Sequence, residues 1–195
     1  MEYIIKEEKM MSERIAIIGS GNAFFKDEGI GLYAAKYLKE NYKFDPKIEV
    51  VDGGTLGFKL MPLLQEFDDV IIVNTASDDM KKIGEITIKT TDEFLDGDLI
   101  KKTANEVEIA EMLQICSLTE AMAETTVISI VPEDIIAVEV GLSEKLTSRW
   151  EAYIQTIINQ IEALGVAVSQ GDKSMELEEI LDIFANPSIE HSRGF

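Results

Sequence analysis

Cysteine and histidine are almost absent from the sequence, with one of each among 195 residues. The single cysteine, Cys116, excludes an internal disulfide and a cysteine-rich metal site, and within an apolar helical pattern we expect it to act as a small hydrophobe. The single histidine, His191, lies in a polar tail. Because a Ser–His–Asp or Cys–His catalytic set would depend on it, and zinc-protease motifs need paired histidines, the sequence argues against these peptidase mechanisms.

Basic residues are also scarce, since 18 lysines and arginines stand against 37 acidic residues and give a formal net charge of −19. A surface this acidic repels phosphate backbones and anionic lipids, so nucleic acids and membrane surfaces are disfavoured as partners. Cations and basic protein segments are favoured instead, although solubility alone accounts for much of the excess charge.

Long apolar runs are missing too. No stretch approaches the roughly 20 residues that span a bilayer. Residues 1–11 contain no apolar core of signal-peptide length. We therefore expect a cytoplasmic protein.

The apolar residues form short β-branched runs that alternate with longer stripes of helical spacing. Residues 70–73 are β-branched throughout, as in a central parallel strand, and residues 85–89 alternate like an edge strand. Strands separated by helices predict a single-domain α/β fold, a three-layer sandwich with a mostly parallel central sheet. Strands are predicted at 15–18, 48–51, 70–73, 85–89 and 126–131, helices from 28 and over 55–64, 105–118, 146–164 and 177–184, and a polar loop at 92–103.

Three loops with small or polar residues follow predicted strands, at 19–28, 52–55 and 74–77. Ligands of open α/β sheets bind at the carboxyl ends of strands, so these loops predict a site. The first loop has Phe24 where a dinucleotide fingerprint needs its third glycine, and it lacks the Lys-Ser/Thr pair of a phosphate-binding loop. Nucleotide binding is therefore disfavoured.

Acidic residues in these loops have both a structural and a functional interpretation. Asp27 and Glu28 open a predicted helix, where acids complement the helix dipole. That role suffices for Asp27, whereas Glu28 borders the predicted site. Asp52 follows a strand, where acids and glycines often only make a turn. The adjacent Gly53 and Gly54 would also let a peptide backbone approach closely.

Several motifs, in this order, resemble those of the nickel–iron hydrogenase maturation endopeptidases. Residues 17–22 (IIGSGN) and 27–31 (DEGIG) resemble the first signature of that family, and residues 51–57 (VDGGTLG) resemble its second. The resemblance continues through segments at 70–77, 105–108, 130–133 and 141–143. It covers about 14–165, which implies one α/β domain there, an N-terminal extension at 1–13 and a partly helical C-terminal extension at 166–195.

The resemblance implies an endopeptidase that removes a short C-terminal extension from a hydrogenase large-subunit precursor once nickel has been inserted. It also implies that the nickel of the substrate is recognised by a glutamate, an aspartate and a histidine. The glutamate corresponds to Glu28, but Asn74 and Asn105 stand at the other two positions. A neutral amide oxygen is a poor nickel ligand compared with carboxylate or imidazole, so nickel binding should be weak.

The other site residues implied by the resemblance are Asp52 as a catalytic residue, with Gly53 and Gly54 at substrate-binding positions. The protein would have no cofactor of its own, because nickel belongs to the substrate. The partner would be a hydrogenase large-subunit precursor or a similar metalloprotein.

Two nearby carboxylates could compensate for the lost nickel ligands. Of Glu106 and Glu108, the latter lies one helical turn from Asn105 and is the better candidate. Whether the chain is an active enzyme stays open, and three functions follow. It is an endopeptidase, a non-catalytic chaperone or checkpoint for a hydrogenase or other metalloprotein precursor, or a small-molecule-binding α/β domain on an inherited scaffold.

Overall fold

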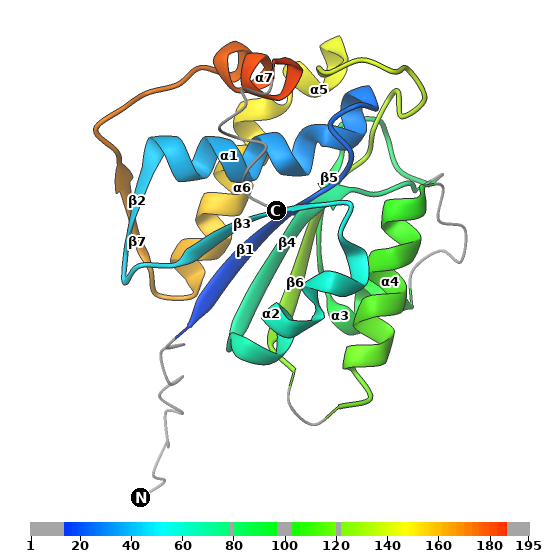
Figure 1. The fold of residues 1–195 in the computed structure, drawn as a ribbon, viewed down its shortest axis with the longest axis vertical. Coiled ribbons are helices and arrows are strands. Elements are labelled where there is room, and N and C mark those ends of the chain that lie inside the picture. The colour runs from blue at the N-terminus through cyan, green and yellow to red at the C-terminus, as the bar shows by residue number, and fades with distance from the viewer. Residues whose placement is uncertain (1–13, 79, 97–102, 120–121, 187–195) are drawn as a thin grey trace, which may run out of the picture.

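The computed structural model describes residues 14–78, 80–96, 103–119 and 122–186 (Figure 1). The expected extension at 1–13 and His191 lie outside the described residues. Four parallel strands and one antiparallel edge strand form the central sheet, which confirms the predicted fold class and the places of 70–73 and 85–89 in it. Their spatial order is β3 (Glu49–Gly54), β1 (Ile15–Ser20), β4 (Asp69–Thr75), β6 (Glu124–Ile130) and β5 (Ile86–Thr90).

Helices cover both faces of the sheet, as Figure 1 shows. One layer contains α1 (Ile30–Asn41), α5 (Glu144–Thr147), α6 (Trp150–Ala163) and α7 (Leu177–Ala185). The other contains α2 (Met61–Glu66), α3 (Thr91–Leu95) and α4 (Ala104–Cys116). Short 3-10 turns, η1 (Lys26–Gly29) and η2 (Gly57–Leu60), precede α1 and α2. No helix among the described residues is long and apolar enough to cross a membrane.

The two helical layers pack on two separate cores. Successive side chains of β4 point to opposite faces of the sheet and so contribute to both cores. Ile71 and Val73 belong to the core on the side of α1 and α6, and Val70 and Ile72 belong to the opposite core. Burying each such side chain contributes about 1.5–3 kcal/mol. Cys116 is fully buried in the second core, and desolvation raises the pKa of its thiol. It packs there as the small hydrophobe expected from the sequence.

Three elements were not predicted. Strand β2 (Tyr42–Asp45) pairs antiparallel with β7 (Ala167–Gln170) to make a second, two-stranded sheet. Helix α3 occupies the start of the predicted polar loop, so that prediction was wrong for this part. A capping box between Thr90 and Glu93 begins the helix, and burial of Phe94 fixes it.

The segment after residue 165 packs against the domain. Ile180 of α7 is fully buried in the core that contains α1, and Phe184 makes an edge-on ring contact with Tyr33 at 5.1 Å between centroids. The side chain of Asn41 donates to the carbonyl oxygen of Met175 and accepts from its amide. The helix expected at 177–184 is confirmed, whereas the domain boundary at 165 stays a prediction.

The apolar stripe of α6 is buried as predicted, including Trp150 and Ile157. Tyr153 in this stripe also connects α6 to the sheet. Its hydroxyl lies 3.1 Å from the carbonyl oxygens of both Asn74 and Ile128, and burial raises the pKa of the hydroxyl, so it stays a proton donor.

We expect Tyr153→Phe to lower the free energy of unfolding by about 1–2 kcal/mol, because two buried carbonyl oxygens lose their shared donor. Urea denaturation measures this change. Tyr42→Phe is the matched control, since the Tyr42 hydroxyl makes no hydrogen bond within the described part of the chain and should change stability by less than about 0.5 kcal/mol. Equal effects of the two substitutions would contradict the proposed role of Tyr153.

Candidate functional site

A groove of about 480 Å³ lies at the carboxyl ends of the parallel strands. The loops after these strands and the start of α4 meet at this end of the sheet, as expected for an α/β fold. The lining combines two carboxylates with polar and apolar side chains. It consists of Asn22, Phe25, Glu28, Thr55, Thr103, Ala104, Asn105, Glu108, Ile135 and Ile136.

Glu28 is held in this groove by close packing of α1 on the sheet. A Cβ atom at Gly31 would collide with the carbonyl oxygens of Val73 and Ser20, so glycine is required there. Glu28 lies in the 3-10 turn just before this contact and is only 6% exposed. Desolvation raises the pKa of Glu28, a hydrogen bond with Thr103 lowers it, and the charge of Glu106 raises it again. A cation or hydrogen-bond donor in the groove would therefore stabilise the ionised form of Glu28.

Asn74 and Asn105 are both buried, and the amide oxygen of each already has a partner. Asn74 Oδ1 accepts a 2.7 Å hydrogen bond from Ser129 Oγ, and Asn105 Oδ1 accepts one of 2.9 Å from Ser20 Oγ. Their Nδ2 groups have no partner among the described residues. Asn105 lines the groove together with Glu28, whereas Asn74 lies at the end of β4 and is not part of the lining. The oxygen atom with which each asparagine could bind nickel is therefore already occupied by a hydrogen bond.

Asp52 lies within the last part of β3, opposite Gly19 of β1, and does not line the groove. Its Oδ1 accepts a 3.1 Å hydrogen bond from the amide of Gly54, whose carbonyl oxygen accepts from Ser20 Oγ at 3.3 Å. The single hydroxyl proton of Ser20 is shared between this carbonyl oxygen and Asn105 Oδ1, which is the nearer acceptor at 2.9 Å, and these contacts connect Asp52 to the groove. The Asp52 side chain is open to solvent, yet partial desolvation raises its pKa, and the bond from Gly54 opposes that shift.

The two glycines after Asp52 differ in role. A Cβ atom at Gly53 would lie 2.7 Å from Ile18 Cγ2 and 2.8 Å from the carbonyl oxygen of Gly19, so the absence of a side chain there serves internal packing. Gly54 has φ +49 and open space around its α-carbon, with Asp52 Oδ1 the nearest atom at 3.9 Å. Of the two, Gly54 is the position at which a peptide backbone can approach.

The two candidate compensating carboxylates are used differently. Glu106 accepts hydrogen bonds from the amide and hydroxyl of Ser77, at 2.6 and 2.9 Å, and from the amide of Thr103. It thus fixes the loop after β4. The Thr-x-x-Glu capping-box pattern in the sequence accounts for its bond to Thr103, whereas nothing in the sequence indicated its bonds to Ser77. Glu108 lines the groove. Within the described ranges, no group of three or more His, Cys, Asp or Glu side chains could hold a metal ion.

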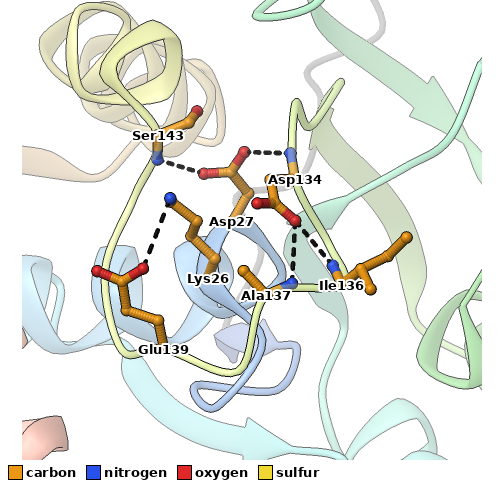
Figure 2. Close-up of polar contacts among 7 residues, drawn as sticks. All are labelled: Lys26, Asp27, Asp134, Ile136, Ala137, Glu139 and Ser143. Atoms are coloured by element: carbon orange, nitrogen blue, oxygen red, sulfur yellow. Dashed lines mark hydrogen bonds and ion pairs between the residues drawn. The ribbon is translucent and has the colours of Figure 1, made fainter.

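The sequence interpretation gave Asp27 only a helix-dipole role, and the structure shows that its carboxylate also binds a distant loop. Figure 2 shows its carboxylate between the two ends of the loop that connects β6 to α5. Oδ2 accepts from the amides of Glu133 and Asp134 at 2.9 Å each, and Oδ1 accepts from the amide of Ser143 at 2.6 Å. The side chain is fully buried. These partners lie more than 100 residues away in sequence, so the helical context of Asp27 could not reveal them.

We expect Asp27→Asn to lower the free energy of unfolding by about 2–3 kcal/mol, because the amide keeps one acceptor oxygen and loses the charge that strengthens these bonds. Urea denaturation is the measurement. Glu139→Gln is the matched control on the same loop: its ion pair with Lys26 is 3.6 Å long and the Glu139 side chain is 62% exposed, so the loss should stay below about 1 kcal/mol. Similar losses in both variants would show that Asp27 does not hold this loop.

Comparison with known proteins identifies the family of this chain. The family described as "Hydrogenase maturation protease" matches residues 32–160. Protein HydD of Wolinella succinogenes is 27% identical over 153 residues, which are 76% of this chain and 95% of HydD. The hydrogenase 2 maturation protease of Escherichia coli is 24% identical over 154 residues, 78% of this chain and 93% of that protein.

Solved structures show the same fold. The hydrogenase maturating endopeptidase HybD from Escherichia coli matches with a TM-score of 0.71 at 22% identity, over 80% of this chain and 97% of HybD. The maturation protease HybD from Thermococcus kodakarensis matches with a TM-score of 0.62, also at 22% identity, over 76% of this chain and 99% of that one. The family match spans well over half the length of this chain, and the chain therefore belongs to the hydrogenase maturation protease family.

Proposed function

We propose that this protein is an endopeptidase that removes the C-terminal extension of a nickel-loaded hydrogenase large-subunit precursor in the cytoplasm. The observation that carries the proposal is the family match over residues 32–160. The retained acids Glu28 and Asp52 support it, since hydrogen bonds through Ser20 and Gly54 connect Asp52 to the groove that contains Glu28.

The chemical roles follow from the two environments. Burial disfavours the ionised form of Glu28 and raises its pKa. A cationic group of the substrate would stabilise the ionised carboxylate, so we expect Glu28 to bind such a group. Asp52 is solvent-accessible, and its raised pKa suits a group that exchanges protons with water or a peptide. Gly54, with open space at its α-carbon, would let the substrate backbone pass next to Asp52.

A second function is a non-catalytic chaperone or checkpoint that binds the precursor without cutting it. The occupied amide oxygens of Asn74 and Asn105 favour it, because among the described residues they leave the groove with Glu28 and Glu108 as its carboxylates. In this alternative the protein would recognise the precursor but lack the means to use its nickel.

Cleavage of the precursor separates these functions. Purified protein is mixed with nickel-loaded large-subunit precursor, and mass spectrometry follows the shortened product. We expect the product with the unmodified protein, and at least about 100-fold slower formation with Asp52→Asn if Asp52 transfers a proton in the reaction. Glu49→Gln, at the start of the same strand, is the matched control. Binding of the precursor without any product would support the checkpoint function instead.

We expect the isolated protein to bind nickel weakly. The double substitution Asn74→Asp and Asn105→His should raise the affinity at least about tenfold, or about 1.4 kcal/mol, because it introduces a carboxylate and an imidazole. Calorimetry at fixed salt and near neutral pH measures this, since exposed acids also attract cations loosely. One equivalent bound at submicromolar strength by the unmodified protein would contradict the expectation. Loss of such binding in Glu108→Gln would identify Glu108 as the compensating ligand.

A further inference from the structure

The loop after β6 carries large apolar side chains on its outer side, next to the groove. Ile136 is 81% exposed and Val138 is 78% exposed. Phe24, on the loop after β1, is 63% exposed and lies beside them, because its carbonyl oxygen accepts a 2.9 Å hydrogen bond from the amide of Glu139. We call Phe24, Ile136 and Val138 the apolar rim. Ile136 also lines the groove, so the rim and the groove form one continuous surface.

This loop has no regular secondary structure, yet it is held in place at several points (Figure 2). Asp27 fixes its two ends, as described above. Asp134 Oδ1 accepts from the amides of Ile136 and Ala137 at 3.0 Å each, and the amide of Lys26 donates to the carbonyl oxygen of Glu139 at 2.8 Å. The rim residues are therefore presented to solvent by a fixed backbone. A partner that binds them would lose little free energy to ordering the loop.

Adjacent exposed apolar side chains on an ordered loop mark a surface for a partner. The charge of the protein indicates which kind. Glu28 and Glu108 line the groove next to the rim, and the chain carries a net charge of −19. Two copies of this chain would repel each other, whereas a basic segment would be attracted.

We propose that the apolar rim is the docking surface for the large-subunit precursor. The segment bound there has an apolar side chain on Phe24, Ile136 and Val138 and a neighbouring lysine or arginine directed at Glu108. This inference rests on the proposed function, because it takes the precursor as the partner. It adds that protein contacts on the rim, outside the nickel-recognition positions, provide much of the affinity.

The test measures binding of purified large-subunit precursor to the full-length protein by calorimetry. We expect the double substitution Ile136→Ser and Val138→Ser to weaken binding by about tenfold or more, because apolar anchors at the centre of a contact dominate affinity. Leu118→Ser is the matched control: Leu118 is 84% exposed and follows α4 at the end of the helix away from the groove. It should leave the affinity unchanged, and neither variant should change the thermal midpoint, since all three side chains are exposed.

A second arm tests the charge. Glu108→Gln should weaken binding of the precursor and reduce its dependence on salt, because one attraction between charges is lost. The same precursor with the lysines and arginines of its C-terminal segment replaced by glutamine should bind more weakly to the unmodified protein. It should also lose most of its sensitivity to Glu108→Gln.

The outcomes separate the two proposals. If the unmodified protein neither binds nor cleaves the precursor, the proposed function is wrong and the inference falls with it. If the precursor is bound and cleaved normally by the rim variant, only the docking surface is wrong. The docking surface is also wrong if the unmodified protein is a dimer in light scattering and the rim variant is a monomer. That result would assign the rim to contact between copies of the chain.

Discussion

The buried carboxylate of Asp27 determines the shape of the groove. It accepts three backbone hydrogen bonds from a loop distant in sequence and thereby joins the segment before α1 to the segment before α5. Glu28, the next residue in the chain, and Ile135 and Ile136 of the joined loop all line the groove. The positions of this carboxylate and of these two apolar side chains therefore depend on Asp27, which does not line the groove itself.

The sequence predicts well those elements whose pattern is complete in one segment. The strand at 70–73 and the stripe of α6 are examples, because burial on both faces or on one helical face leaves a local signature. Strands β2 and β7 could not be predicted, since four residues give little periodicity and each strand forms only by pairing with the other, as between Tyr42 and Gln170. Helix α3 was missed although its capping box was present in the sequence.

In the candidate site, too, the sequence predicts what depends on one segment and not what depends on contacts between distant residues. The segments that hold Glu28, Asn74, Asn105 and Asp52 could be assigned to one end of the sheet, because parallel strands end together, although the structure places Asn74 and Asp52 in the last residues of their strands and not in loops. The hydrogen bonds that determine the chemistry of Asn74 and Asn105 could not be predicted from the sequence. Ser20 and Ser129 occupy the two amide oxygens through pairings across 85 and 55 residues, and a serine in a strand carries no signal of such a partner.

The single cysteine, buried in the second core, allows opening of that core to be followed by chemical labelling. Cys116 closes α4, the helix whose first turn carries Asn105, and its thiol is inaccessible and disfavoured as a thiolate. A thiol-specific reagent can reach it only when α4 separates from the sheet. Because Cys116 ends α4 at the opposite end from Asn105, the rate of labelling at this one atom reports how often that end of the helix separates from the core.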